Sequence, residues 1–245
     1  SVCVMGPLLA KRRRAQVSMP GGCAIGDRPI DLHILGLQTL GADFELLNGD
    51  VLLRSKRLRG AEVFLGGPFG SSVTATANVM MAATLAEGRT IISSAACEPE
   101  VIDLADFLNA CGARITGQGT PEITVEGVTK LKGCDHKVIP DRIEAGTFMI
   151  AAAMTNGDVE LLGARLDHMR AVVDRLRRVG VMIERGVLVR DEAGTETHKG
   201  LKYKYADEKL KPEKFPDRVD EAQIKADGGG LLLGSGVTLN ASKVA

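Results

Sequence analysis

The sequence predicts a repeat-built α/β fold, and three observations support this prediction. Three helical patterns place apolar residues at offsets of 0, 4, 7 and 10 and end in Gly at offset 11, and their glycines, Gly41, Gly112 and Gly180, recur about every 70 residues. A second marker has the same period, since GRTII begins at Gly88 and GDVEL at Gly157, each after a helix rich in Ala and Met. Aromatic residues make up only 3% while glycines number 29, a balance that suits helices packed closely on sheets and fits an all-β sandwich poorly.

Each repeat unit is predicted to run strand, helix, strand, helix, strand, strand. The second helix is amphipathic, and its apolar residues in the three units are Ile30, Ile34, Leu37 and Leu40, then Val101, Ala105, Leu108 and Cys111, then Met169, Val173, Leu176 and Val179. Each terminal Gly is placed to end its helix in the left-handed conformation, and three residues later an apolar residue starts a strand, namely Phe44, Ile115 and Ile183. The first helix is apolar on most faces, so several units must pack around shared, buried helices. A helix that crosses between two strands implies that those strands are parallel.

Charge and composition exclude several classes of partner. Lys plus Arg number 31 and Asp plus Glu number 31, so the overall field is weak and no nucleic-acid or anionic-membrane partner is expected. The basic run KRRR at residues 11–14 is interpreted as a solvated turn that leads into a strand, rather than as an interaction patch.

The cysteines indicate the redox environment. They number five, and because none forms a CxxC pair, neither a disulfide framework nor a zinc site is expected, and a reducing cytoplasm fits best.

No apolar stretch reaches the roughly 18 residues that a membrane helix needs. The chain begins at Ser1, already inside apolar, helix-like sequence, which suggests a fragment.

From about residue 193 the repeat pattern stops. We therefore interpret residues 1–192 as the repeat region and residues 193–245 as an atypical tail. The tail is rich in Lys as far as Lys214 and ends in GGGLLLGSGVTLNASKVA, with no helix of the repeat type. Disorder is the first expectation for the tail, ahead of a linker or of sequence unrelated to the fold.

The segment PGGCAIGDRPIDLH, residues 20–33, is the most specific in the chain. Three glycines around Cys23 imply a mobile, exposed loop, whereas a packing cysteine normally sits in an apolar periodic run as Cys111 does. Arg28, five residues further on, is placed to lower the pKa of the thiol and to hold a phosphate or carboxylate. The residues alone leave two interpretations open, a reactive thiol acting on an anionic substrate and a chance cysteine in a flexible turn.

A second loop, GGPFGSSVTAT at residues 66–76, joins the predicted strand AEVFL to an Ala- and Met-rich helix. Its hydroxyls stand at the N-terminus of that helix, where unpaired N–H groups and the helix dipole favour a phosphate. No GK[ST] follows, so the loop is not a P-loop. An ordinary Ser/Thr helix cap explains the same residues equally well.

Other polar residues are interpreted as structural. Asp141 is a natural N-cap and Glu144 completes a pattern like a capping box, while Glu98 and Glu100 are acids in the first turn of a helix. His33 fills a slot on an otherwise apolar helix face, where a hydrogen-bonded, partly buried histidine is expected rather than a catalytic base. None of the remaining histidines has a partner at metal-ligand spacing, so we expect no metal and no cofactor.

Several segments, taken in order, resemble the UDP-N-acetylglucosamine enolpyruvyl transferases. The matching strings are MGPLLA, VSMPGGCAIGDRPIDLH, SSVTATANVMMAATLAEG, AACEPEVIDLADFLNACGARITGQGT and VIPDRIEAGTFMIAAAMTNG. The likeness covers roughly residues 1–190 and is dense. The related enolpyruvylshikimate phosphate synthases share the repeat but lack the PGGC loop.

The resemblance implies an inside-out α/β barrel built of βαβαββ units, here incomplete, with substrates bound between two domains. It also implies the reaction: the enolpyruvyl group of phosphoenolpyruvate passes to the 3′-hydroxyl of UDP-N-acetylglucosamine by addition and then elimination of phosphate, without a metal. This reaction is the first committed step of bacterial peptidoglycan synthesis.

The resemblance also assigns site residues. Cys23 matches the loop cysteine that protonates the methylene carbon of phosphoenolpyruvate, a role that suits a thiol titrating near neutral pH. Arg28 matches an arginine near phosphoenolpyruvate and the sugar nucleotide. The segment lining the uridine is matched by Arg28, Pro29, Ile30, Asp31 and Leu32. The loop at the UDP phosphates is matched by Gly70, Ser71, Ser72 and Val73, although GGPFG gives this loop a different length.

The chain also departs from the resemblance. In that family a Lys-Asn pair and an Arg precede the position of Ser1, and an Asp and further arginines follow residue 190. Within the tail, FPDRVDEAQ is a faint echo of a family segment and would nominate Asp217. Because the charged residues that the family places before Ser1 and after residue 190 are missing here, we expect this chain alone to be nearly inactive. The alternatives left open are a fragment that only binds the UDP-sugar and a related enolpyruvyl transferase, and the sequence does not determine the oligomeric state.

Overall fold

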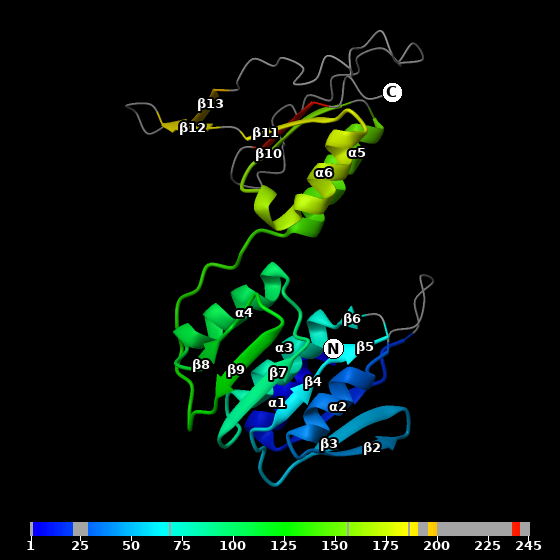
Figure 1. The fold of residues 1–245 in the computed structure, drawn as a ribbon, viewed down its shortest axis with the longest axis vertical. Coiled ribbons are helices and arrows are strands. Elements are labelled where there is room, and N and C mark those ends of the chain that lie inside the picture. Colours follow the sequence, from blue (N-terminus) through cyan, green and yellow to red (C-terminus); the bar gives the residue numbers. More distant parts are fainter. Residues whose placement is uncertain are drawn as a thin grey trace. The chain divides into compact units, whose positions relative to one another are not determined.

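This computed structural model describes residues 2–21, 29–68, 70–155 and 157–185, together with short strands at 187–190, 196–199 and 237–240. The chain forms two compact units, Ser1–Ile139 and Pro140–Ala245. Figure 1 shows the helices and strands of both units.

The first unit carries most of the secondary structure. Its elements are η1 (Val2–Val4), α1 (Met5–Arg12), β1 (Arg14–Ser18), α2 (Asp31–Thr39), β2 (Asp43–Leu47), β3 (Asp50–Arg54), β4 (Glu62–Phe64), β5 (Gly66–Gly67), β6 (Gly70–Ser71), α3 (Val73–Ala83), β7 (Arg89–Ser93), α4 (Pro99–Ala110), β8 (Arg114–Thr116) and β9 (Glu122–Glu126). From β4 onward the order is strand, helix, strand, helix, strand, strand, apart from the small hairpin β5–β6. The repeat predicted from the sequence is confirmed here.

Two sheets cover the helices of this unit. The first has the strand order β1-β3-β2 and is antiparallel, and the second has the order β4-β7-β9-β8. In the second sheet β4 and β7 are parallel, with Val63 beside Ile92, because α3 carries the chain from one strand to the next. β9 lies antiparallel to both β7 and β8.

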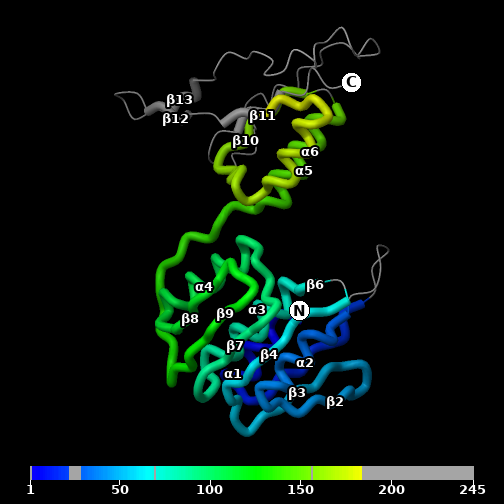
Figure 2. The backbone as a smooth tube through the Cα atoms, in the orientation of Figure 1, coloured from blue at the N-terminus to red at the C-terminus, as the bar shows by residue number. Residues whose placement is uncertain are grey.

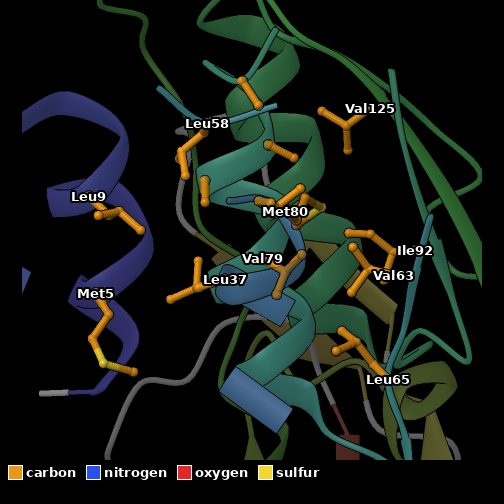
Figure 3. Packing of buried hydrophobic residues seen from close by; sticks show 14 of the residues in the cluster. Met5, Leu9, Leu37, Leu58, Val63, Leu65, Val79, Met80, Ile92 and Val125 are labelled. Carbon is orange, nitrogen blue, oxygen red and sulfur yellow. The ribbon is translucent and has the colours of Figure 1, made fainter. Parts of the chain in front are cut away.

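Helix α3 is the buried centre of the first unit. It packs against α1, α2 and α4 as well as β7 and β9. Figure 3 shows its Val79 and Met80 among side chains from other elements, including Leu37 of α2 and Ile92 of β7, and both α3 residues are fully buried. A helix that is apolar on most faces, as the sequence predicts here, is stable only when neighbours cover every side.

The three glycines of the repeat end their helices as predicted. Gly41, Gly112 and Gly180 have φ values of +95°, +100° and +94°, in the left-handed region where a side chain would be strained. The apolar positions before them are buried or half-buried, with one exception. Val179, the C-cap of α6, is 59% exposed.

The second unit contains α5 (Arg142–Met154), β10 (Asp158–Leu161), η2 (Leu166–Met169), α6 (Arg170–Arg178), β11 (Met182–Arg185), β12 (Val187–Arg190), β13 (Glu196–Lys199) and β14 (Val237–Asn240). Its hydrophobic core includes Met149, Leu161, Val173 and Ile183. β14 pairs antiparallel with both β10 and β11, and β12 pairs with β13.

The structure describes only part of the predicted tail, residues 193–245, and all of the basic run at residues 11–14. Only β13 and β14 of residues 193–245 are described, and Asp217 lies outside the described residues. Residues 11–14 are exposed as predicted, although Lys11 and Arg12 form the last turn of α1 and only Arg13 turns, with φ +59°. In the part of the chain that is described, no helix is long and apolar enough to cross a membrane.

Candidate functional site

The two segments singled out from the sequence as binding elements begin two neighbouring helices. Residues 29–32 lead into and begin α2, and residues 70–73 lead into and begin α3. The two helices pack on each other, and Figure 2 shows their tubes close together in the first unit. Leu32 also approaches the hairpin β5–β6, because a Cβ placed on Gly67 would lie 3.2 Å from Leu32 Cδ1. Segments about 40 residues apart in sequence thus meet at one end of the unit.

The α3 segment makes a capped helix N-terminus. Ser72 is the N-cap, with extended backbone, and its hydroxyl accepts a hydrogen bond from the N–H of Ala75 at 3.2 Å. The ordinary cap interpretation is therefore confirmed for Ser72. A capped helix still presents its first N–H groups and the positive end of its dipole outward, so the cap does not exclude an anion there. Gly70, with φ +91°, and Ser71 are exposed in the hairpin just before it.

The α2 segment presents a mixed surface. Pro29 and Asp31 are exposed, Leu32 is half-buried, and Ile30 is buried as the residue preceding the helix. Asp31 places a carboxylate in the first turn of α2, where the helix dipole stabilises negative charge. A hydroxyl-binding carboxylate and an apolar surface beside it are the groups that a nucleoside needs.

His33 connects the two segments through hydrogen bonds. Its Nε2 lies 3.1 Å from Thr74 Oγ1, and its Nδ1 lies 2.9 Å from Asn78 Nδ2. The ring is buried, and burial lowers the pKa of His33, an effect that the nearby Asp31 carboxylate opposes. The prediction of a buried, hydrogen-bonded histidine is confirmed.

The orientation of the Asn78 amide follows from its partners. The backbone N–H of Gly6 can only donate, and it lies 2.6 Å from one end of the Asn78 amide, so that end is the acceptor Oδ1. The other end, Nδ2, therefore faces the Val2 carbonyl and His33. An amide nitrogen can only donate, and therefore His33 Nδ1 must accept. A neutral His33 then carries its proton on Nε2 and donates it to Thr74, which leaves the Thr74 hydroxyl proton to be donated to another partner.

A further hydrogen bond ties α3 to the sheet. The buried Thr76 hydroxyl accepts from the N–H of Ala96 at 3.1 Å, in the loop that follows β7. This contact and the Asn78 contacts fix α3 along two of its sides. The N-terminus of α3 is thereby positioned by buried polar groups and not only by apolar packing.

Two predicted site residues, Cys23 and Arg28, lie outside the described residues. The structure places residues 29–32 at the start of α2 and residues 70–73 at the start of α3, and these two helices pack on each other. Sequence reasoning missed Asn78, although a single amide within an apolar helix is a signal that a buried partner exists. It also missed the pairing of His33 with Thr74.

Other parts of the described chain add no metal ligands. No group of three or more His, Cys, Asp or Glu side chains suitable for a metal ion occurs among the described residues. A cavity of about 530 Å³ lies at the opposite end of α3, where Arg13, Arg57, Glu87 and Thr129 are among its lining residues. Arg57 and Glu87 form an ion pair there. None of the binding residues predicted from the sequence lines this cavity.

The fold is that of the α/β enolpyruvyl transferases. A sequence model of the EPSP synthase (3-phosphoshikimate 1-carboxyvinyltransferase) family matches residues 1–226, and the chain belongs to this family.

Within the family, the chain is similar to curated proteins named UDP-N-acetylglucosamine 1-carboxyvinyltransferase. The protein of Methylacidiphilum infernorum is 56% identical over 184 residues, which cover 75% of this chain and 44% of that protein. One from Caldanaerobacter subterraneus is 53% identical over 213 residues, covering 86% of this chain and 49% of that protein. The chain thus spans about half the length of the curated relatives it matches.

Solved structures agree on the fold. The enolpyruvyl transferase NikO from Streptomyces tendae aligns with a TM-score of 0.56 at 21% identity, covering 73% of this chain and 43% of that one. EPSP synthase from Acinetobacter baumannii aligns with a TM-score of 0.55 at 24% identity, covering 81% of this chain and 44% of that one. The predicted α/β repeat architecture, incomplete in this chain, is that of the enolpyruvyl transferases.

Proposed function

We propose that this chain contributes the catalytic-loop half of an enzyme that transfers the enolpyruvyl group of phosphoenolpyruvate to the 3′-hydroxyl of UDP-N-acetylglucosamine. The names of relatives at 51–56% identity support this substrate pair. The activity belongs to cytoplasmic peptidoglycan synthesis, and through it to cell shape and division. Neither a metal nor a cofactor enters the proposed reaction.

One structural observation carries the proposal most directly. The two segments proposed to hold the nucleotide, at the starts of α2 and α3, are joined by the bond of 3.1 Å between His33 and Thr74. A diphosphate placed at the N-terminus of α3 would face the helix dipole and the Thr74 hydroxyl, while the uridine would lie against residues 29–32.

The proposed roles follow from the chemistry of each group. Ser71, Ser72 and Val73 offer backbone N–H groups and hydroxyls to the phosphates, and Asp31 accepts hydrogen bonds from hydroxyl or imide groups of the uridine. Arg28 neutralises phosphate charge, and Gly70 lets the backbone approach it. Leu32 and Pro29, with Ile30 buried behind them, supply the apolar surface for the base.

Cys23 is proposed as the general acid. In the addition step its thiol gives a proton to C3 of phosphoenolpyruvate while the sugar 3′-oxygen bonds to C2 and releases its own proton to a base. In the elimination step the bond from C2 to the phosphate oxygen breaks, phosphate leaves, and C3 returns a proton to the Cys23 thiolate. A thiol suits both directions, because it can hold or release a proton near neutral pH.

A second candidate function is binding of the UDP-sugar without turnover. The coverage favours it, since this chain aligns with only 44% of its relative from Methylacidiphilum infernorum. The segments named above would then bind the nucleotide while groups needed for the chemistry are supplied by other sequence.

Labelling of Cys23 tests the proposal and separates the two candidates. The chain is treated with an epoxide that resembles phosphoenolpyruvate, with and without UDP-N-acetylglucosamine, and each cysteine is quantified by mass spectrometry. The transferase proposal expects selective labelling of Cys23 that accelerates with the nucleotide sugar, and Cys23→Ser abolishes it. Phosphate release from phosphoenolpyruvate is measured in parallel.

The outcomes are distinct. Phosphate release by this chain would reject the binding-only candidate. Sugar-dependent labelling without phosphate release would support a thiol coupled to a nucleotide site in a chain that lacks part of the catalytic machinery. Labelling of Cys23 no faster than that of the exposed Cys3 and Cys97, and indifferent to the sugar, would reject a functional site in this chain.

A further inference from the structure

Two cysteines of the first unit lie side by side away from the proposed nucleotide site. Cys111 is the C-cap of α4 and is buried, and Cys134 lies half-buried in the segment 127–141, which has neither helix nor strand. Their Sγ atoms are 3.3 Å apart. They stand 23 residues apart in the chain, so no local motif such as CxxC reveals the pair in the sequence.

Contacts on both sides of Cys134 hold the segment against α4. On one side the N–H of Lys132 donates to the carbonyl of Cys111 at 2.9 Å. On the other side His136 Nε2 lies 2.9 Å from Asp103 Oδ1, and the His136 ring meets that of Phe107 edge-on with centroids 5.5 Å apart. Contacts made by Lys132 and by His136 therefore position the two sulfurs near each other.

The geometry is close to that of a disulfide. A disulfide places its sulfurs about 2.05 Å apart, so these sulfurs must approach by roughly 1.3 Å. The segment that carries Cys134 belongs to no sheet or helix, so this movement disrupts no helix or strand ladder. Cys134 is also the more accessible of the two thiols, which suits it to meet an external oxidant first.

We propose that Cys111 and Cys134 form a redox-active dithiol site that reacts with small disulfides of the glutathione disulfide class. The Cys134 thiolate attacks one sulfur of glutathione disulfide, the S–S bond breaks, and one glutathione leaves as a thiol. Cys111 then loses its proton and attacks Cys134 Sγ, which releases the second glutathione. Two protein thiols are oxidised by two electrons, and one glutathione disulfide is reduced to two thiols that take up the two protons.

The internal disulfide would fasten segment 127–141 to the end of α4. Residues 127–139 of that segment are the last part of the first unit, which ends at Ile139. The dithiol site shares no residue with the segments proposed to bind the nucleotide sugar. The dithiol proposal therefore stands or fails independently of the proposed function. The hydrogen bond to Cys111, followed by burial, raises the pKa of the Cys134 thiol, and its reaction should therefore accelerate as the pH rises.

Mapping by mass spectrometry tests the proposal. The chain is equilibrated with mixtures of reduced and oxidised glutathione, the remaining thiols are alkylated, and tryptic peptides are analysed without reduction. The same experiment is run on a variant in which Cys3, Cys23 and Cys97 are all replaced by Ser, which leaves only the pair. We expect a cross-linked Cys111–Cys134 peptide in both proteins, and an increase of about 5 °C or more in the melting temperature of the oxidised form.

Cys134→Ser is the matched control, because it removes the cross-link without creating a cavity in the core. In that variant Cys111 should remain alkylatable and the melting temperature should no longer depend on the glutathione mixture. The proposal is rejected if Cys134 carries only a glutathione adduct, or none, in mixtures that fully modify the exposed Cys3. It is equally rejected if the cross-link forms but pairs either cysteine with Cys97.

Discussion

Asn78 Nδ2 lies 2.9 Å from His33 Nδ1, so a side chain of the central helix α3 determines which nitrogen of an α2 histidine carries the proton. The amide is itself oriented by the N–H of Gly6 in α1. One residue therefore joins three helices that meet below the candidate site. Because all of these groups are buried, the loss of any one leaves others without partners.

Replacing Asn78 by Ala should lower the free energy of unfolding by about 3 kcal/mol, because it leaves the Gly6 N–H, the Val2 carbonyl and His33 Nδ1 without their partner. Urea denaturation measures the change. Asn109→Ala is the matched control, since Asn109 makes two hydrogen bonds, both to Ile115, and is only half-buried. Asn109→Ala should lower the free energy of unfolding by about 1 kcal/mol. Equal decreases for the two variants would contradict the buried network around Asn78.

His33 should make the stability of the first unit depend on pH. Burial holds the pKa of His33 below its unfolded value of 6.5, so the unfolded chain binds more protons in the window below that value. The stability contributed by neutral His33 is fully present above pH 6.5 and is lost as the pH falls toward the folded pKa. Nuclear magnetic resonance titration of the ring reports this pKa directly.

His33→Gln is the control for this pH dependence, because its amide can accept from Asn78 and donate to Thr74 without titrating. The difference in unfolding free energy between wild type and this variant should change between pH 7 and pH 5, with the wild type losing more. A constant difference, or a ring that titrates above 6.5, would show that burial does not govern His33.

Thr74→Val should weaken the binding of UDP-N-acetylglucosamine about tenfold, because it removes a hydroxyl whose proton is left for the ligand while keeping the shape of the side chain. Thr74→Ser retains the hydroxyl and should bind within about twofold of wild type. Isothermal titration calorimetry measures both. If the two variants bind equally, Thr74 does not contact the nucleotide, and if the wild type does not bind, the proposed nucleotide site itself is absent.

Gly6→Ala should destabilise the first unit by about 2 kcal/mol or more, because a Cβ at this position would lie 2.1 Å from the backbone oxygen of Asn78. The substitution pushes α1 away from α3 and lengthens the bond from the Gly6 N–H. Gly133→Ala is the control, since no atom lies within 4 Å of the Cβ it would add. Thermal denaturation should separate the two variants, and a neutral Gly6→Ala would mean that α1 and α3 pack less closely than described.

Part of the fold could be predicted from periodicity alone. The glycines that end α2, α4 and α6 are positioned by a local requirement for positive φ, which the residue type satisfies by itself. The N-cap role of Asp141 is equally local, because its carboxylate accepts from the N–H groups of Ile143 and Glu144 just beyond it. Val179 departs from the pattern, since burial depends on which neighbours are present and not on the helix that carries the residue.

The sequence by itself determined the α/β repeat, the ends of its helices and the two segments that begin α2 and α3. Only the tertiary structure decided that His33 reaches Thr74, that Asn78 links three helices, and that Cys111 meets Cys134. The physical reason is range: helix periodicity and capping act over a few residues along the chain. Contacts between residues 23 to 76 positions apart exist only after packing has brought their elements together, and no local pattern records them.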